Sequence, residues 1–119
     1  MIKQYKITPV PKPRQTRADK WKQRPCVMRY RAFADEVRRL EIQLPHSVCH
    51  VIFIIPMPKS WSEKKRLDWF ERPHQQTPDI DNLFKALADA VYKSDCKIWD
   101  VRMTKLWGFD GKIIIKDCD

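Results

Sequence analysis

Apolar residues recur along the chain with two periods, and the shorter period predicts four strands. Residues 3–10 (KQYKITPV) hold β-forming side chains and end at prolines, which predicts a first strand. Residues 47–57 (SVCHVIFIIPM) form a β-branched run that predicts a buried strand, and Pro56 closes it because proline has no N–H for a ladder. Residues 97–108 and 112–117 predict two further strands, joined by a turn at GFDG.

A helical period is found in three other segments. From Cys26 to Leu44 the apolar residues recur at helical intervals, which predicts a first long helix. Residues 58–70 open with the capping box Ser60-x-x-Glu63 and predict a short helix that presents its lysines outward. A second amphipathic helix is predicted by the spacing of Ile80, Leu83, Phe84, Leu87 and Val91.

The resulting order is β-α-β-(short α)-α-β-β. It indicates an α/β (α+β-like) fold, with a single-layer mixed β-sheet and helices packed on one face. At 119 residues the chain has room for one domain, residues 1–119, with a proline-rich basic loop at about 11–25. The longest apolar run, VIFII, is far too short to span a bilayer, so we expect a cytoplasmic protein without a membrane partner. Four widely spaced cysteines without a C-x-x-C pair favour ordinary thiols.

Lysine and arginine are concentrated near the N-terminus. Residues 1–31 carry ten of them against one acid, Asp19, which alone accounts for the formal net charge of +9. A second cluster, KKR at residues 64–66, follows Trp61, and both Trp21 and Trp61 are available for stacking. A solvated basic surface is the simpler alternative, but the asymmetry favours a nucleic-acid partner. The candidate contacts to the backbone of that nucleic acid are Lys12, Arg14, Arg17, Lys20, Lys22, Arg24, Lys64, Lys65 and Arg66.

Acidic residues gather in one segment of this basic chain, TPDIDNLFKALADAVYKSD at residues 77–95. Pro78 disfavours helix at the residue before it, so we expect the helix to start near Asp81 or Asn82, with Asp79 just outside. Both carboxylates can then converge at a helix N-terminus. Capping explains one such aspartate, since Asp is a favoured N-cap, but a pair is more than a cap requires.

The remaining acids of the segment allow two interpretations. Asp81, Lys85 and Asp89 fall on one helical stripe, either as exposed ion pairs or with Lys85 beside a metal site. Asp95 follows the helix end, as a plain turn residue or as a third ligand. Clustered carboxylates repel one another, and a hard divalent cation such as Mg²⁺ or Mn²⁺ removes that penalty. Such an ion activates water for phosphodiester hydrolysis.

The chain resembles the RusA family of Holliday-junction endonucleases in four segments. These are MPKSWSEKKR (57–66), PH (73–74), PDIDNLFKALADAV (78–91) and SDCKIWD (94–100). The resemblance covers roughly residues 2–117 in order and length. Its core is the pattern D-x-D-N-L-x-K, followed by a later acid near the start of a strand.

The resemblance implies Mg²⁺-dependent cleavage of branched DNA, namely four-way junctions, by a homodimer. Mn²⁺ is an alternative ion, and no small-molecule cofactor is implied. The family's three metal-binding aspartates and its functional lysine fall on Asp79, Asp81, Asp95 and Lys85. Asp89 and Asp100 match acidic positions with a supporting role. The implied setting is DNA recombination and repair in the cytoplasm of a bacterial or phage-infected cell.

A dimer is also expected on physical grounds, because two symmetric cuts require two active sites and a two-fold dimer supplies them. Two other functions fit parts of the sequence. One is a non-catalytic nucleic-acid-binding module whose acids cap a helix and pair with lysines. The other is a metal-dependent nuclease that acts on other branched DNA or on RNA.

Overall fold

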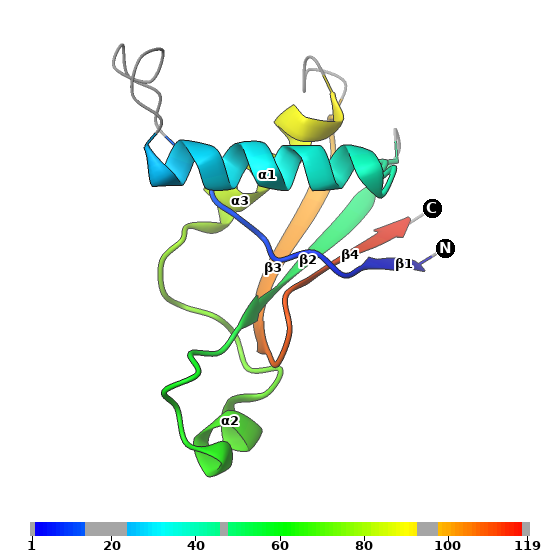
Figure 1. Ribbon diagram of the computed structural model, residues 1–119. Coiled ribbons are helices and arrows are strands. Elements are labelled where there is room, and N and C mark those ends of the chain that lie inside the picture. The colour runs from blue at the N-terminus through cyan, green and yellow to red at the C-terminus, as the bar shows by residue number, and fades with distance from the viewer. Residues whose placement is uncertain (1, 14–23, 46–47, 93–97, 118–119) are drawn as a thin grey trace.

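A computed structural model gives the fold of residues 2–13, 24–45, 48–92 and 98–117. Its elements are β1 (Ile2–Tyr5), α1 (Pro25–Arg39), β2 (Cys49–Pro56), α2 (Glu63–Trp69), α3 (Ile80–Val91), β3 (Val101–Gly108) and β4 (Lys112–Asp117). This order and the mixed four-stranded sheet confirm the predicted architecture (Figure 1). Among the described residues, no helix combines the length and the apolar character needed to cross a bilayer.

The sheet has the strand order β1-β4-β2-β3. β2 runs parallel to β3, whereas β4 is antiparallel to both β1 and β2. Two neighbouring parallel strands need a long connection between them, and the segment that contains α2 and α3 supplies it. The position of α3 over the sheet is therefore set by the strands on either side of it in sequence.

One face of the sheet carries the hydrophobic core. Val51 and Phe53 on β2 lie opposite Ile115 and Ile113 on β4, and all four residues are at most 4% exposed. α1 and α3 lie against the sheet (Figure 1), and their apolar stripes complete this core. The helices contribute Phe33, Ala34, Val37, Leu83, Ala86, Leu87 and Ala90.

α2 lies apart from this layer, beyond the end of β2 (Figure 1). None of its residues is buried. The ring of Trp61, just ahead of α2, lies 5.9 Å from the ring of Trp69 and 4.9 Å from that of Trp107. Aromatic contacts to the end of β3 thus hold this part of the chain, where the aliphatic core does not reach.

α1 ends before the predicted boundary at Leu44, because the chain makes a Schellman turn. Glu41 has a positive φ of 54°, and its amide donates to the Arg38 carbonyl at 3.1 Å. The Ile42 amide donates to the Val37 carbonyl at 3.2 Å. Leu44, the last residue of the predicted apolar stripe, is still buried, so its spacing extended the predicted helix past the observed end. Glycine, the usual signal for this turn, is absent from the segment.

The predicted strand boundaries also change. The strand predicted for residues 3–10 ends at Tyr5, whose partner lies near the start of β4, and Ile7 leaves the sheet to enter the core. The strand predicted for residues 97–108 begins only at Val101, where pairing with β2 starts. In both cases β-forming residues continue beyond the available partner strand.

The cap of α2 differs from the predicted capping box. Ser62, not Ser60, is the N-cap, and its Oγ accepts a hydrogen bond from the Lys65 amide at 3.2 Å. Ser60 lies in a turn in which the Trp61 amide donates to the Pro58 carbonyl at 3.2 Å. The turn delays the helix start by two residues relative to the predicted cap.

Candidate active site

Asp79 and Asp81 flank the first residue of α3. Asp79 is the N-cap with extended backbone (φ −69°, ψ 146°), just outside the helix as predicted, but its carboxylate makes no capping hydrogen bond. Asp81 lies in the first turn, and its Oδ1 accepts the Asn82 amide at 2.9 Å. Both side chains are exposed. The helix start therefore presents two carboxylates to solvent, at the end where the helix dipole favours negative charge.

The connection from α2 to α3, residues 70–79, is fastened to β3 by backbone hydrogen bonds. The Glu71 amide donates to the Trp107 carbonyl at 2.9 Å, and the Trp107 amide donates to the Arg72 carbonyl at 2.9 Å. The His74 amide then donates to the Lys105 carbonyl at 3.0 Å. These bonds place the connection along the outer edge of β3.

The His74 side chain packs against the same part of β3, and we call this contact the His74 anchor. It is 5% exposed, and its ring lies 4.3 Å from the ring of Trp107. Burial, with a smaller effect of the Lys105 charge, lowers the pKa of the imidazole. Its Nδ1 is buried without a hydrogen-bond partner among the described residues. His74 is thus held as a neutral ring that packs against an indole.

The Lys105 side chain reaches the last residues before the aspartates. Its Nζ donates to the Gln76 carbonyl at 2.6 Å and to the Pro78 carbonyl at 2.7 Å. The Thr77–Pro78 peptide bond between these two carbonyls is cis. Burial lowers the pKa of Lys105, and the Asp79 carboxylate partly opposes this effect. The ammonium is therefore within electrostatic reach of the first aspartate of the site.

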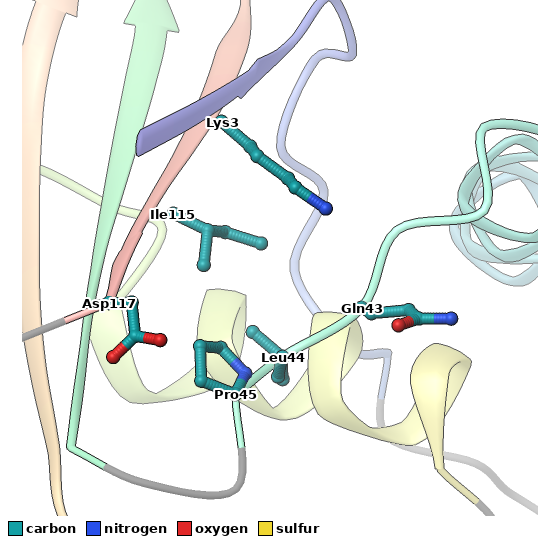
Figure 2. A pocket seen from close by; sticks show the side chains of 6 residues that line it. All are labelled: Lys3, Gln43, Leu44, Pro45, Ile115 and Asp117. Carbon is teal, nitrogen blue, oxygen red and sulfur yellow. The ribbon is translucent and has the colours of Figure 1, made fainter. Parts of the chain in front are cut away.

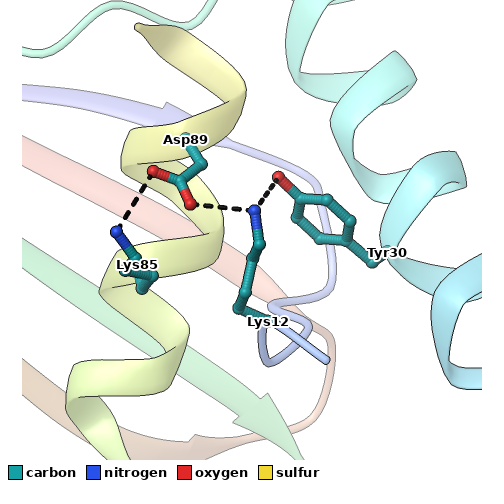
Figure 3. Close-up of polar contacts among 4 residues, drawn as sticks. All are labelled: Lys12, Tyr30, Lys85 and Asp89. Carbon is teal, nitrogen blue, oxygen red and sulfur yellow. Dashed lines mark hydrogen bonds and ion pairs between the residues drawn. The ribbon is translucent and has the colours of Figure 1, made fainter. Parts of the chain in front are cut away.

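At the other end of α3, Asp89 forms ion pairs with two lysines of the protein (Figure 3). Asp89 Oδ2 accepts a hydrogen bond from Lys12 Nζ at 2.8 Å, and Oδ1 lies 3.6 Å from Lys85 Nζ. Lys12 Nζ also donates to the Tyr30 hydroxyl at 3.3 Å. Burial lowers the pKa of Lys12, but the hydrogen bonds to Asp89 and Tyr30 outweigh it and the pKa is raised. Lys12, a predicted DNA contact, is thus part of an ion pair between the N-terminal segment and α3.

The second predicted basic cluster lies on α2. Lys64 and Lys65 are exposed, and Lys65 Nζ lies 4.1 Å from the centroid of the Trp61 ring. Arg66 is half-buried, with its guanidinium 5.6 Å from the centroid of the Phe109 ring. Trp61, which the sequence suggested for base stacking, packs within the aromatic contacts of this end of the molecule.

Several predicted site residues lie outside the described residues, namely Asp95, Arg14, Arg17, Lys20, Lys22 and the stacking candidate Trp21. Arg24 directly precedes α1, and Asp100 is exposed just before β3. Within residues 2–13, 24–45, 48–92 and 98–117, no three acidic, histidine or cysteine side chains come together as a metal site. The described part of the candidate site therefore supplies a pair of carboxylates, Asp79 and Asp81.

Lys105 was not singled out from the sequence, and His74 appeared there only within the PH segment of the resemblance, without a role. A signal for Lys105 was nevertheless present in the strand pattern. Lys105 pairs with Phe53 of β2, whose side chain lies in the core. Met103, Lys105 and Trp107 are two residues apart along β3, so they share this face of the sheet. A lysine at a core-facing strand position needs a partner for its charge, which marks it as a residue with a specific task.

A pocket of about 170 Å³ lies elsewhere, between the β1–β4 edge and the segment after α1 (Figure 2). It is lined by Lys3, Gln43, Leu44, Pro45, Ile115 and Asp117. Neither α3 nor the connection before it contributes to this lining. The candidate active site is instead the exposed start of α3, which is open to a macromolecule rather than enclosed around a small ligand.

Comparison with protein families matches residues 5–116 to the family described as Endodeoxyribonuclease RusA. The matched segment contains both aspartates at the start of α3, the connection before them and Lys105. Comparison with curated proteins gives no match. The family match covers most of the chain, so its catalytic class applies to the fold described above. The chain belongs to the RusA family of Holliday-junction endodeoxyribonucleases, which hydrolyse phosphodiester bonds.

Proposed function

We propose that this protein resolves four-way DNA junctions by Mg²⁺-dependent hydrolysis, with Asp79, Asp81 and Asp95 as the metal ligands. The observation that supports this most is the uncommitted carboxylate of Asp79. A helix start built only for stability would use an aspartate at this position to cap its own amides. Asp79 instead faces solvent beside Asp81, without a capping bond. Two such oxygen donors suit a ligand that comes from outside the chain.

The donor set fits Mg²⁺. This ion prefers oxygen ligands, and proteins often bind it through one or two carboxylates, with phosphate oxygens and water completing its coordination. Asp79 and Asp81 supply such a pair, and Asp95, outside the described residues, is the proposed third ligand. When bound, the ion would lower the pKa of a water molecule and stabilise charge on the attacked phosphate.

The chain's own side chains contribute charge and orientation. Neighbouring carboxylates repel one another, and the positive end of the α3 dipole reduces that cost. Lys85 lies one turn after Asp81 on the same side of the helix, and its side chain is 54% exposed. We assign Lys85 to the phosphate, where its ammonium would stabilise negative charge on the oxygens or orient the attacking water.

The DNA backbone is proposed to lie along the basic residues. Lys64 and Lys65 are exposed on α2, and Arg24 precedes α1. In the sequence, Arg24 follows the segment that contributes the other candidates, Arg14, Arg17, Lys20 and Lys22. Lys12 and Arg66 are more enclosed, and they add to the positive field around these residues. Contacts to phosphates position a duplex without reading its sequence. A homodimer would place two such surfaces and two metal sites on one junction.

Cleavage of a synthetic four-way junction by the purified protein tests this proposal. We expect paired cuts in the presence of Mg²⁺ or Mn²⁺, none without a divalent ion, and far weaker cleavage of a linear duplex or an RNA hairpin of matched sequence. Asp81→Asn should abolish cleavage and keep or strengthen junction binding, because it removes a negative charge that faces phosphate.

Each alternative function has its own outcome in the same assay. Normal cleavage by Asp81→Asn would rule out the proposed metal site. Equal cleavage of all substrates would identify a nuclease without selectivity for junctions. Binding without cleavage in every buffer would identify a non-catalytic DNA-binding protein. Gel filtration with light scattering, at the concentrations used for cleavage, decides whether the active species is a dimer.

A further inference from the structure

Lys105 holds both ends of the segment that leads to Asp79. Its backbone carbonyl accepts the His74 amide at 3.0 Å. Its Nζ donates to the Gln76 carbonyl at 2.6 Å and to the Pro78 carbonyl at 2.7 Å. Three contacts from one residue therefore fix residues 74–78, and Asp79 follows directly after them.

The position of Lys105 is itself fixed by the sheet. It lies within β3 and pairs with Phe53, which is fully buried in β2. The next residue on the same face of β3, Trp107, is 4% exposed. A lysine between such neighbours has a well-defined starting point for its side chain. Through its bond to the Pro78 carbonyl, the ammonium therefore fixes the backbone just before Asp79 relative to the sheet.

Backbone stability alone does not explain a lysine at this position. Gln76 is exposed, so water could satisfy its carbonyl without a cation, and Pro78 is only half-buried. A core-facing strand position normally takes an apolar residue, and partial burial of an ammonium is unfavourable. Burial indeed lowers the pKa of Lys105, with the Asp79 carboxylate opposing that effect. The charge lies within electrostatic reach of the carboxylate that our proposed function uses as a metal ligand.

We propose that Lys105 is a positioning residue for the metal site, which holds the Pro78 carbonyl and so fixes the Asp79 carboxylate for a divalent cation. This inference rests on the proposed function. Loss of a residue that orients a metal ligand typically reduces metal affinity or activity by about 10–100-fold. Loss of the positive charge alone would act in the opposite direction, because a nearby cation repels the metal ion. The sign of the change in Mg²⁺ requirement therefore separates positioning from charge.

The test uses the full-length protein and the variants K105M, K105R and D79N, with K3M as a control for loss of a strand lysine elsewhere. Junction cleavage is measured against Mg²⁺ concentration. Metal binding is measured independently, from the rise in unfolding temperature with Mg²⁺. We expect K105M to need about tenfold more Mg²⁺ in both measurements, with metal-free junction binding unchanged. K105R keeps the charge and the donors, so it should recover most of the affinity, and K3M should match the wild type.

The outcomes separate this inference from the function on which it rests. Normal cleavage by D79N would overturn the proposed function, whatever K105M does. An inactive D79N together with an unchanged or lower Mg²⁺ requirement for K105M would leave the metal site intact and overturn the role of Lys105. If K105M is unfolded at the assay temperature, K105Q replaces it. K105Q lacks the charge and has a shorter reach, so a Mg²⁺ requirement equal to that of the wild type would again overturn the inference.

Discussion

The two ends of α3 carry aspartates that the fold treats in opposite ways. At the C-terminal end, Asp89 is 24% exposed and lies against two lysines, Lys12 at 2.8 Å and Lys85 at 3.6 Å. At the N-terminal end, Asp79 and Asp81 are exposed, and neither forms an ion pair with a described lysine or arginine. The chain holds 24 lysines and arginines against 15 acids, so bases for such pairs are not scarce.

This contrast shows that the contacts of an aspartate side chain, rather than its position in the sequence, indicate whether it stabilises the fold. Asp89 is paired with a lysine 77 positions away, which joins the N-terminal segment to the helix layer. Asp79 is positioned through the backbone before it, by His74 and Lys105, while its own carboxylate stays uncommitted. The first arrangement joins two parts of the fold, and the second leaves a carboxylate available for the metal ion that we propose.

The largest expected effect is the difference in cleavage between Asp79→Asn and Asp89→Asn. Asp79→Asn should slow junction cleavage by more than about a hundredfold, because loss even of residues that only orient a metal ligand can cost that much. Asp89→Asn should stay within about tenfold of the wild type, since that carboxylate serves the fold. Single-turnover cleavage at saturating protein measures both. Equal losses in the two variants would contradict the division of roles along α3.

Lys85 lies between the two ends, and its substitution shows which of them it serves. If Lys85 acts on the phosphate, Lys85→Met should lower the cleavage rate by about a hundredfold, as removal of one charge-stabilising donor does elsewhere. Lys85 is the exposed partner of its ion pair with Asp89, one helical turn away, so the free energy of unfolding should change by no more than about 0.5 kcal/mol. Lys85→Arg is the matched control. A loss of stability without a loss of rate would assign Lys85 to the fold.

The ion pair between Lys12 and Asp89 should contribute to stability rather than to catalysis. Asp89→Asn should lower the free energy of unfolding by about 1.5–3 kcal/mol, the range for hydrogen bonds to charged groups. The pKa of Lys12 is raised above 10.5 in the fold, so this contribution is present below that pH and is lost as pH rises through the raised pKa. Urea denaturation at neutral and alkaline pH measures both effects. The double variant Lys12→Met/Asp89→Leu should lose less than the sum of its single changes.

The smallest expected effect concerns the anchor at His74. Its pKa is lowered from 6.5 in the fold, so the unfolded chain binds a proton more readily. The contribution of His74 to the free energy of unfolding should therefore be fully present above pH 6.5. It should fall as the pH drops from 6.5 through the lowered pKa, and level off below that pKa. Urea midpoints between about pH 7.5 and 5 should show this decline, and His74→Gln should reduce it. His50, whose pKa is also lowered, provides the comparison variant His50→Gln.

The elements of the fold were predictable because their apolar residues keep one period over a whole strand or helix. α3 runs from Ile80 to Val91, the two ends of the predicted apolar stripe. The stop of α1 was not predictable in the same way, because Glu41 takes a backbone conformation that the sequence usually marks with glycine. The local apolar period thus predicts where a helix or strand lies in the sequence. The residues at which it ends depend on backbone turns and on neighbouring strands, which the period does not show.

The placement of two candidate site residues was predictable from the sequence. Asp79 and Asp81 were located by Pro78, which sets the start of the helix. The roles of Lys105 and Asp89 depend on contacts between distant segments, so no local pattern could assign them. Composition suggested a DNA partner for Lys12, and only the fold reveals that this lysine is paired with an acid.

The backbone bonds that fasten the connection to β3 also restrict how two copies of the chain can associate. An open strand edge invites pairing with another chain, and covering the edge prevents it. Between Lys105 and Trp107 the outer edge of β3 is already occupied by Arg72 and its neighbours. A second subunit therefore cannot extend the sheet along this stretch. A two-fold assembly that extends the sheet must use another stretch of edge, which restricts how a pair of cutting centres can be spaced around one crossover.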